Sequence, residues 1–220
     1  MKALSEWDSK LRLGQRLPRP AEILATSRAQ AEEFAAAMDG RVVAKASGVA
    51  HKTEGRLVRL GLVPSDIGEA WSDLAAAGDG SVLLAEQLNA ELELIVGGYR
   101  DPGFGPLVTI GIGGIAAEIF SDVVAILAPP EEGEVADAVA QLAGRRLLGG
   151  IRGGPPVDLK ALEVIVGVVA ELLCSDPAVA EIDCNPVMVC NGIPIVADAL
   201  VVLHEQHQAP ASCSKMKSQD

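Results

Sequence analysis

The stretch 180–203, "AEIDCNPVMVCNGIPIVADALVVL", carries the strongest short-range structural signal in the chain. At its centre, Asn191-Gly192 separates two apolar runs. An Asn-Gly pair in this setting is typical of the two-residue turn of a β-hairpin, because both turn positions need a positive φ. Such a turn also fixes the strand register, so that Cys190 faces Ile193 and each further pair has the same sum of residue numbers. The sequence therefore predicts an antiparallel hairpin with a defined register.

That register brings three oxygen-bearing side chains together at one end of the hairpin. Asn185 falls opposite Asp198, and cross-strand partners have Cβ atoms about 5 Å apart. Asp183, two residues before Asn185, lies on the same face. A site with few protein oxygens suits Mg²⁺, whose other ligands are usually waters and oxygens of substrate phosphates. The pattern predicts a Mg²⁺ site, and a solvated polar end of the hairpin is the alternative.

Composition restricts the class of protein. The chain has 220 residues, of which 49% are hydrophobic and only 3% aromatic, so its core must consist mainly of Ala, Val, Leu and Ile. A net charge of −12 disfavours general binding to nucleic acid, whose phosphates would be repelled. No apolar run is long enough to span a bilayer, and the N-terminal residues have no signal-peptide core. The four cysteines show no CxxC spacing. We therefore expect a cytoplasmic protein with reduced thiols and no contact with membranes.

Helical and strand-like patterns follow one another along the chain and predict a two-lobe α/β (α+β) protein. Ser27, followed three residues later by Gln30, predicts the start of a helix that ends at Gly40. Further helices are expected after Ser65, in the run 131–144, and after Asp158, with strands between them. We expect an N-terminal lobe over 1–80, a C-terminal lobe over 81–203 and a flexible tail over 204–220. A cleft between two lobes is a natural ligand site.

Two cations have positions that suit anion binding. Lys45 ends the apolar run "RVVAK", and a lysine there must be paired or lie at the lip of a cleft, because burying it unpaired is costly. Phosphate is its simplest partner. Arg100 is the only basic residue between Arg59 and Arg145 and precedes a Gly-Pro turn. It suits contact with phosphate or carboxylate, although an ordinary surface arginine explains it equally well.

Glycines and carboxylates complete the set of candidate ligand contacts. In "GIGG", Gly111, Gly113 and Gly114 offer backbone N–H groups that no side chain obstructs. Such a loop can bind a phosphate or another substrate group, although glycine clusters also form plain turns. Glu86 and Glu93 could accept hydrogen bonds from the hydroxyl or amino groups of a nucleoside. Solubility of an edge strand is the alternative explanation for both.

Taken together, the segments resemble the ATP-grasp domain of the NDP-forming acyl-CoA synthetases, the ADP-forming acetate–CoA ligase type, which are relatives of the succinyl-CoA synthetase β subunit. The resemblance runs from about Leu17 to Leu203. It rests on "VVAKASGVAHKTEGRLVRLGL", "ELELIVGGYRDPGFGPLVTIGIGGIAAEIF", "LLGGIRGGPPVD" and "EIDCNPVMV". The resemblance implies a two-lobe ATP-grasp fold with a nucleotide cleft between the lobes.

The resemblance also implies roles for single residues. Lys45 would contact the nucleotide phosphates. Glu86 and Leu88 lie in the segment that holds the adenine in such proteins, and Glu93 would bind the ribose hydroxyls. Asn185 and Asp198 would hold Mg²⁺, in agreement with the hairpin register.

In this family a histidine carries phosphate between the acyl-CoA site and the nucleotide. The primary phosphohistidine belongs to another domain or subunit, of α type, which also binds CoA; no such sequence occurs here, so the chain is compatible with a hetero-oligomer. His51 resembles the second, relaying histidine, and Asp183 would orient a phosphohistidine. The loop before His51 is shorter than usual in the family, and Gly55 stands alone where a glycine pair is customary.

The resulting hypothesis is the ATP/ADP-Mg²⁺-binding subunit of an NDP-forming carboxylate–CoA ligase, an acid–thiol ligase that needs a partner subunit and transfers a phosphoryl group through phosphohistidine. One alternative is a free-standing ATP-grasp carboxylate–amine ligase, which would not need His51. The other is a non-catalytic nucleotide-binding module, which the short loop before His51 would favour.

Overall fold

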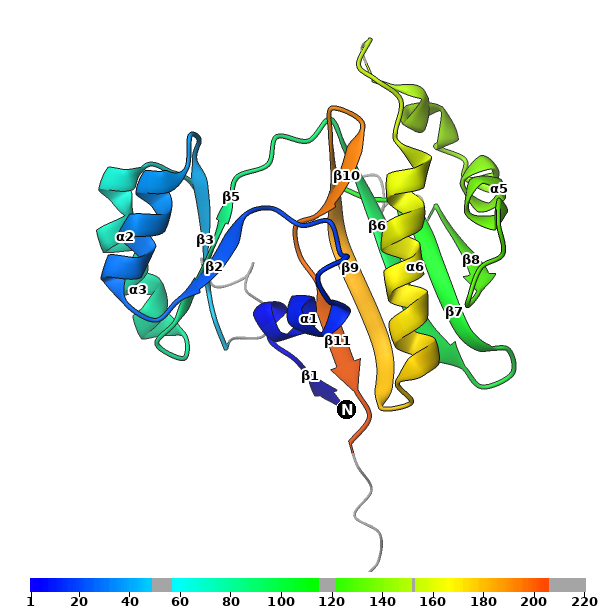
Figure 1. Ribbon diagram of the computed structural model, residues 1–220, viewed down its shortest axis with the longest axis horizontal. Coiled ribbons are helices and arrows are strands. Elements are labelled where there is room, and N and C mark those ends of the chain that lie inside the picture. Colours follow the sequence, from blue (N-terminus) through cyan, green and yellow to red (C-terminus); the bar gives the residue numbers. More distant parts are fainter. Residues whose placement is uncertain (49–56, 115–121, 152, 206–220) are drawn as a thin grey trace, which may run out of the picture.

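The computed structural model describes residues 1–48, 57–114, 122–151 and 153–205 of the chain (Figure 1). Two antiparallel sheets lie side by side, each covered by helices on one face. The architecture is the two-lobe α/β arrangement expected from the sequence. No helix in the described ranges is long and apolar enough to cross a lipid bilayer.

The smaller lobe is a four-stranded antiparallel sheet covered by two helices. Its strands have the order β2 (Glu22–Ala25), β5 (Val82–Glu86), β3 (Val42–Ala46) and β4 (Val58–Leu62). Helices α2 (Arg28–Ala37) and α3 (Ile67–Ala77), the latter preceded by the 3₁₀ turn η1 (Pro64–Asp66), pack against this sheet. Alternate residues of β3 are buried on the helix side. Lys45 therefore points to the opposite side, because successive strand residues face opposite ways.

The larger lobe is a seven-stranded antiparallel sheet. Six strands have the order β1 (Lys2–Ala3), β11 (Leu200–Leu203), β9 (Val179–Cys190), β6 (Leu92–Asp101), β7 (Gly105–Ile112) and β8 (Val123–Leu127), and β10 (Ile193–Val196) pairs with β9. One face is covered by α6 (Leu159–Ser175), by α5 (Glu134–Gln141) and by the 3₁₀ turn η2 (Arg145–Gly149). The sheet's other face is not covered by these helices (Figure 1).

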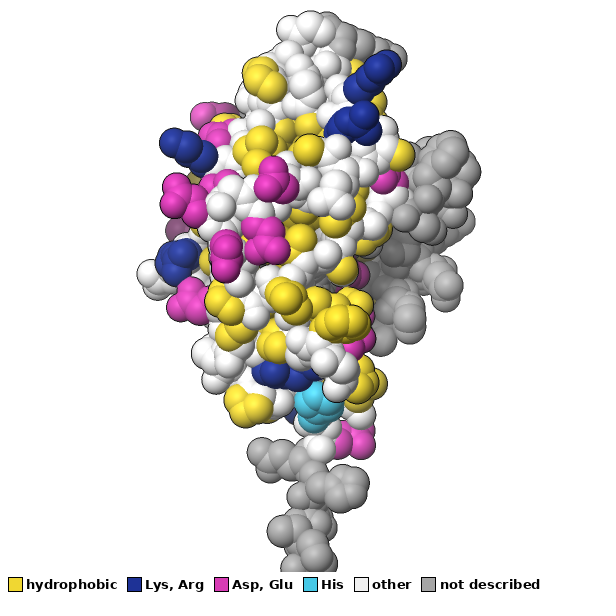
Figure 2. Space-filling model, turned by 90° about the vertical axis from the view of Figure 1, so that its right-hand side faces the viewer, with side chains coloured by type: hydrophobic (Ala, Val, Ile, Leu, Met, Phe, Trp, Pro, Cys, Tyr) yellow, Lys and Arg dark blue, Asp and Glu magenta, His cyan; other side chains and the backbone are white. Residues whose placement is uncertain are grey.

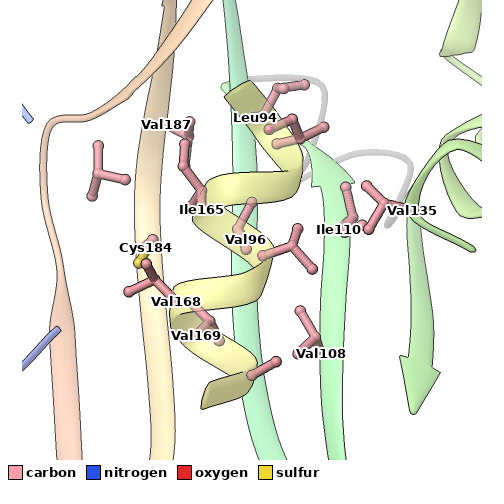
Figure 3. Packing of buried hydrophobic residues seen from close by; sticks show 14 of the residues in the cluster. Leu94, Val96, Val108, Ile110, Val135, Ile165, Val168, Val169, Cys184 and Val187 are labelled. Carbon is pink, nitrogen blue, oxygen red and sulfur yellow. The ribbon is translucent and has the colours of Figure 1, made fainter. Parts of the chain in front are cut away.

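Helix α6 lies close to the middle of the large sheet (Figure 3). Ile165, Val168 and Val169 of α6 belong to one buried apolar cluster with residues of β6, β7 and β9. The approach depends on Gly98 in β6. A Cβ built there would lie only 2.5 Å from Cδ1 of Leu173. Aliphatic packing thus supplies the core, as the low aromatic content requires.

The Asn-Gly hairpin forms with the expected register. Asn191 and Gly192 have φ values of 49° and 80°, and Ile193 pairs with Cys190. The ladder continues to Val196, which faces Val187. The turn chemistry therefore fixed this pairing locally, as the sequence predicted.

A β-bulge in β9 changes which residues of the hairpin are buried. On β6, Leu94 faces Val187 and Val96 faces Cys184, so β9 holds one extra residue between these pairs. The inward-facing positions therefore shift from even to odd numbers after Asn185, and Val187 is buried while Met188 is only half-buried. The strict alternation that the sequence implied across this strand is broken here.

Helix starts agree with the capping signals at two of three places. The side chain of Ser27 accepts a hydrogen bond from Gln30 N, and that of Asp158 accepts from the N–H groups of Lys160 and Ala161. Ser65 instead lies within η1, and α3 begins after Asp66. The proline at position 64 starts the extra turn, because its fixed φ suits the first position of a helix.

The boundary between the lobes differs from the expected one. Helix α1 (Glu6–Leu13) packs with Leu17 against the large lobe, and β1 pairs with β11 of the large sheet. β5 belongs to the small sheet, although the expected boundary placed it in the second lobe. The chain thus begins in the large lobe, forms the small lobe and returns. In the expected tail, His204 and Glu205 are described, and 206–220 lie outside the described residues.

Candidate functional site

Lys45 lies at the junction between the two lobes. Its ammonium group donates to Oε1 of Glu6 at 2.7 Å and to the carbonyl of Ala197 at 3.2 Å, and it lies 3.6 Å from Oδ2 of Asp198. Burial alone would lower the pKa of Lys45, but the carboxylates of Glu6 and Asp198 outweigh it and hold the pKa above its ordinary value. Lys45 is therefore a cation at neutral pH, and it remains 12% exposed. Such a lysine can meet an anion that enters the junction.

A second lysine, which the sequence analysis did not single out, lies behind Lys45. Lys10 of α1 is completely buried and donates to Glu6 at 3.0 Å, to Glu22 at 2.7 Å and to the Ala197 carbonyl at 3.0 Å. The signal that predicts its helix was present in the sequence. Ser5 accepts from the N–H of Asp8, and Ser followed three residues later by Asp is a helix-start pattern. No local pattern predicts that Lys10 of this helix contacts both lobes.

Asn185 and Asp198 are held in register from both sides. The hairpin ladder reaches Val187 and Val196, and the N–H of Ala197 then donates to the carbonyl of Pro186 at 3.0 Å. After the break between β10 and β11, Leu200 on β11 faces Asp183 on β9. The residue numbers of this pair have the same sum as those of the hairpin pairs. Asn185 and Asp198 occupy the corresponding position between these two pairings.

The chemistry of this pair fits Mg²⁺. Asn185 is exposed and the Asp198 side chain is 38% exposed, so both oxygens remain accessible to water and to a ligand. Two oxygen donors leave most positions of an octahedral ion for waters and phosphate oxygens, as Mg²⁺ prefers. The described residues contain no group of three or more His, Cys, Asp or Glu side chains that could hold a metal ion by themselves. The site therefore suits an ion shared with a phosphate ligand, and a transition-metal site would need more side chains.

Asp183 faces a hollow on the side of the large sheet away from α6. The hollow has a volume of about 320 Å³ and is lined in part by Gly97, Tyr99, Thr109 and Glu181. Burial raises the pKa of Asp183 above its ordinary value, and the nearby carboxylates of Glu181 and Asp198 raise it further. Asp183 pairs with Leu200, two residues after Asp198, and this pairing places it next to the Asn185–Asp198 pair. A carboxylate in this position can orient a hydrogen-bond donor that enters the hollow.

Glu93 and two of the predicted glycines come together where β6 begins and β7 ends. The N–H of Gly113 donates to the Glu93 carbonyl at 2.7 Å, and a Cβ on Gly114 would lie 3.4 Å from Oε2 of Glu93. Gly111 lies within β7, where a Cβ would approach Cγ2 of Val123 to 2.7 Å, so this glycine serves close strand packing. The segment that follows Gly114, residues 115–121, lies outside the described residues.

The candidate adenine segment lies where the chain passes from the small lobe to the large lobe. Glu86 ends β5 and is exposed, and Leu88 in the connection is half-buried. Further along the connection, the N–H of Glu91 donates to the carbonyl of Val189 in β9 at 3.0 Å. The connection therefore brings the small lobe, the hairpin and the start of β6 into one neighbourhood.

Arg100 has a structural role, which corrects the prediction of a nucleotide contact. It belongs to the α6-facing side of β6, and its guanidinium donates to the carbonyls of Leu173, Asp176 and Val179. Two of these carbonyls stand at the C-terminal end of α6, where carbonyl groups lack partners inside the helix. Arg100 thus caps α6 on the face opposite the hollow beside Asp183.

His51, the predicted phosphate-carrying histidine, lies within 49–56, which is outside the described residues. The described part of the chain places its two attachment points. β3 ends at Ala46 and β4 begins at Val58, and Lys45 pairs with Val58. The ends of the two flanking strands, which are described, thus lie next to each other at Lys45.

A second hollow can be set aside as a nucleotide site. It has a volume of about 420 Å³ and lies between α5 and α6, where Glu131, Glu132, Glu163 and Glu171 line it. Figure 2 shows acidic side chains gathered on this side of the molecule. Phosphates would be repelled there, so the junction around Lys45 is the better anion site.

Comparison with known proteins identifies the family of the chain. Residues 2–203 match the ATP-grasp domain family. The chain is 28% identical over 216 residues to the acetate–CoA ligase [ADP-forming] II subunit beta of Pyrococcus furiosus, covering 91% of this chain and 92% of that protein. It is 32% identical over 166 residues to the acetate–CoA ligase [ADP-forming] I of Archaeoglobus fulgidus, which is 72% of this chain and 24% of that protein. The chain thus spans only about a quarter of the length of the latter relative.

A solved structure has the same fold. It is the dinucleotide-forming acetyl-coenzyme A synthetase 1 of Ca. Korarchaeum cryptofilum in complex with coenzyme A and Mg-AMPPCP, with its phosphohistidine segment pointing towards the nucleotide binding site. The TM-score is 0.80 at 28% sequence identity, over 92% of this chain and 93% of that chain. The family match over nearly the whole chain and the shared two-lobe architecture lead to one conclusion: the chain belongs to the ATP-grasp family.

Proposed function

We propose that this chain is the nucleotide-binding, β-subunit-like part of an ADP-forming carboxylate–CoA ligase. The observation that carries the proposal is that Lys45 lies 3.6 Å from Asp198 at the lobe junction of a chain related to such β subunits. In the full reaction, a carboxylic acid, CoA and ATP give an acyl-CoA, ADP and phosphate.

The residues of this chain would bind and position the nucleotide. Lys45 would neutralise charge on the β- and γ-phosphates, because its ammonium group is held at the junction as a cation. Asn185 and Asp198 would hold Mg²⁺, which when bound supplies charge neutralisation at the phosphates. Glu86 and Leu88 would border the adenine, and Glu93 would accept hydrogen bonds from the ribose.

Asp183 would orient the histidine that accepts the phosphoryl group. Its carboxylate in the hollow can accept a hydrogen bond from one ring nitrogen, which directs the other towards the γ-phosphorus. A nitrogen–phosphorus bond then forms, the bond from that phosphorus to the bridging oxygen breaks, and ADP leaves. The histidine is either His51 or one supplied by a CoA-binding partner subunit of α type. A partner that carries CoA is needed because the acyl transfer uses that thiol.

Phosphoryl transfer from ATP tests this proposal. The protein would be incubated with Mg²⁺ and ATP labelled in the γ-phosphate, with and without a candidate α subunit, and the labelled residue identified by mass spectrometry. We expect an acid-labile, base-stable label on His51 or on the partner's histidine, and its loss in Lys45→Met. His51→Gln distinguishes labelling of His51 from labelling of the partner's histidine. His204→Gln is a matched control, because His204 is exposed and far from His51 in the sequence. Absence of any histidine label with the partner present would overturn the proposal.

A further inference from the structure

The described side chains around Lys45 form a buried ionic group, here called the α1 cluster: Glu6, Lys10, Glu22 and Lys45. The side chains of Glu6 and Glu22 are each 3% exposed, and that of Lys10 is fully buried. Arg19 donates to the second oxygen of Glu22 at 3.1 Å. Buried charges are tolerated only when they are paired and hydrogen-bonded, and every contact of this cluster meets that condition.

Lys10 connects the three parts of the protein that meet here. An ammonium group has three hydrogens, and those of Lys10 have three acceptors within 3.0 Å: Glu6 on α1, Glu22 on β2 and the Ala197 carbonyl beside β10. Helix α1 is itself tied to the large lobe, because Ser9 Oγ accepts from the N–H of Val201. Lys10 therefore fixes the place of Glu6 relative to both lobes.

One carboxylate oxygen of Glu6 accepts hydrogen bonds from two lysines. Its Oε1 accepts from Lys45 at 2.7 Å and from Lys10 at 3.0 Å. Lys45 thus already has a buried counter-ion before any ligand enters. An incoming phosphate must share Lys45 with Glu6 or replace it, and both are anions within reach of the same ammonium group.

We propose that Glu6 is an internal competitor of the nucleotide phosphates for Lys45, and that Lys10 sets how strongly it competes. The inference rests on the proposed phosphate-binding role of Lys45. A carboxylate attracted by two cations holds each of them less firmly than a carboxylate that has only one. Lys10 therefore weakens the hold of Glu6 on Lys45 and leaves Lys45 able to turn towards phosphate. Glu6 and Lys10 are positioning residues, since both act through Lys45.

The proposal predicts opposite effects from two substitutions in the same cluster. Glu6→Gln keeps an oxygen that can accept from both lysines but removes the competing charge, so Mg·ADP should bind about three- to tenfold more tightly. Lys10→Met removes one of the two lysine ammonium groups that attract Glu6, so Glu6 holds Lys45 more firmly and Mg·ADP should bind about three- to tenfold more weakly. In the double variant both charges are gone, and the affinity should return to within about twofold of the unchanged protein. A merely structural role would weaken binding in all three.

The experiment is calorimetric titration of the full chain with Mg·ADP, together with thermal unfolding of each variant. Glu171→Gln is the matched control, because Glu171 pairs with Arg16 on the surface and both side chains are well exposed. Tighter binding in Glu6→Gln with weaker binding in Lys10→Met supports the proposal. Unchanged or weaker binding in a folded Glu6→Gln overturns it.

Two further outcomes remain distinguishable. Lys10→Met leaves two buried carboxylates with less neutralisation and can fail to fold. In that case the affinity of Glu6→Gln for Mg·ADP tests by itself whether Glu6 competes with phosphate. The double variant then tests the role of Lys10, and an affinity close to that of the unchanged protein supports that role. If Lys45→Met binds Mg·ADP as tightly as the unchanged protein, the phosphate role of Lys45 fails. That result removes the proposed function of Lys45, whereas a failed sign reversal removes only the role of Glu6.

Discussion

Glu6 and Lys45 are 39 residues apart in sequence, yet their side chains meet at 2.7 Å across the junction of the two lobes. Glu6 belongs to a helix that packs on the large lobe, and Lys45 belongs to the central part of the small sheet. The contact exists because the chain begins in one lobe, builds the other and then returns. It places a paired but partly exposed cation beside Asp198, where a phosphate and its metal ion would meet.

The metal site can be tested at Asp198. Asp198→Asn keeps the size of the side chain and removes the negative charge that a divalent cation needs. We expect the affinity for Mg·ADP to fall about tenfold or more, with a smaller change for ADP measured in excess chelator. Titration calorimetry with and without Mg²⁺ measures both. Asp73→Asn, in an exposed pair with Arg59, is the control, and equal Mg²⁺ dependence in the two variants would contradict the assignment.

Substitution of Arg100 tests whether this residue stabilises the end of α6 or contacts the nucleotide. Arg100→Met removes the donors to the carbonyls at the end of α6, and we expect a loss of about 2–4 kcal/mol in the free energy of unfolding. Affinity for Mg·ADP at 25 °C should stay unchanged in the folded variant, because the guanidinium faces away from the junction. Urea unfolding and calorimetry give the two values. Arg146→Met, at an exposed position, should change stability by less than about 0.5 kcal/mol.

The glycine under α6 should be intolerant of even a methyl group. In Gly98→Ala the new Cβ would lie 2.5 Å from Leu173 Cδ1 and 3.0 Å from the Leu107 carbonyl, so the variant should lose about 1–3 kcal/mol. Gly167→Ala is the matched control within α6. Its Cβ would meet nothing within 4 Å, and removing a glycine from a helix should stabilise by about 0.5–1 kcal/mol. Destabilisation of both variants to the same degree would refute the packing argument.

The cysteines should differ sharply in reactivity. Burial, together with the nearby Asp183 carboxylate, raises the pKa of the Cys184 thiol to about 12, whereas Cys174 is exposed. Because the thiolate is the reactive form, iodoacetamide at pH 8 should modify Cys174 and leave Cys184 unmodified in the folded protein. Peptide mass mapping before and after unfolding in guanidinium measures this. Rapid native labelling of Cys184 would mean that the core around β9 opens.

Asp79 should make the small lobe sensitive to acid. Hydrogen bonds from Ser81, assisted by one from Ser47, hold the pKa of Asp79 below its ordinary value of 3.8. The unfolded chain therefore takes up the proton first, and the stabilisation is present above that value and is lost as the pH falls through the lower pKa of the folded state. In Asp79→Asn this dependence should be absent, so its stability and that of the unchanged protein should converge in acid. Urea unfolding between pH 7 and about 3 tests this, with Asp39→Asn at an exposed position as the control.

The sequence by itself determined the features that depend on neighbouring residues. The Asn191-Gly192 turn set the register of β9 and β10, because only a turn of that geometry joins the two strands so closely. The same register predicts that Asn185 lies opposite Asp198, and the flanking pairs Val187–Val196 and Asp183–Leu200 have the matching sum of residue numbers. Ser27 and Asp158 each begin a helix through hydrogen bonds within their own first turn. The resemblance in sequence also implied the fold, which the family match confirms.

Only the tertiary structure decided where long side chains and distant segments find their partners. Arg100 looked like an anion ligand until the end of α6, more than seventy residues away, supplied its acceptors. No sequence pattern marked Lys10 as a buried residue, because two of its acceptors, Glu22 and the Ala197 carbonyl, come from distant segments. The extra residue in β9 reversed the buried face only through pairing with β6. Local chemistry fixes turns, caps and alternation, whereas the partners of buried charges depend on how the packed core brings those segments together.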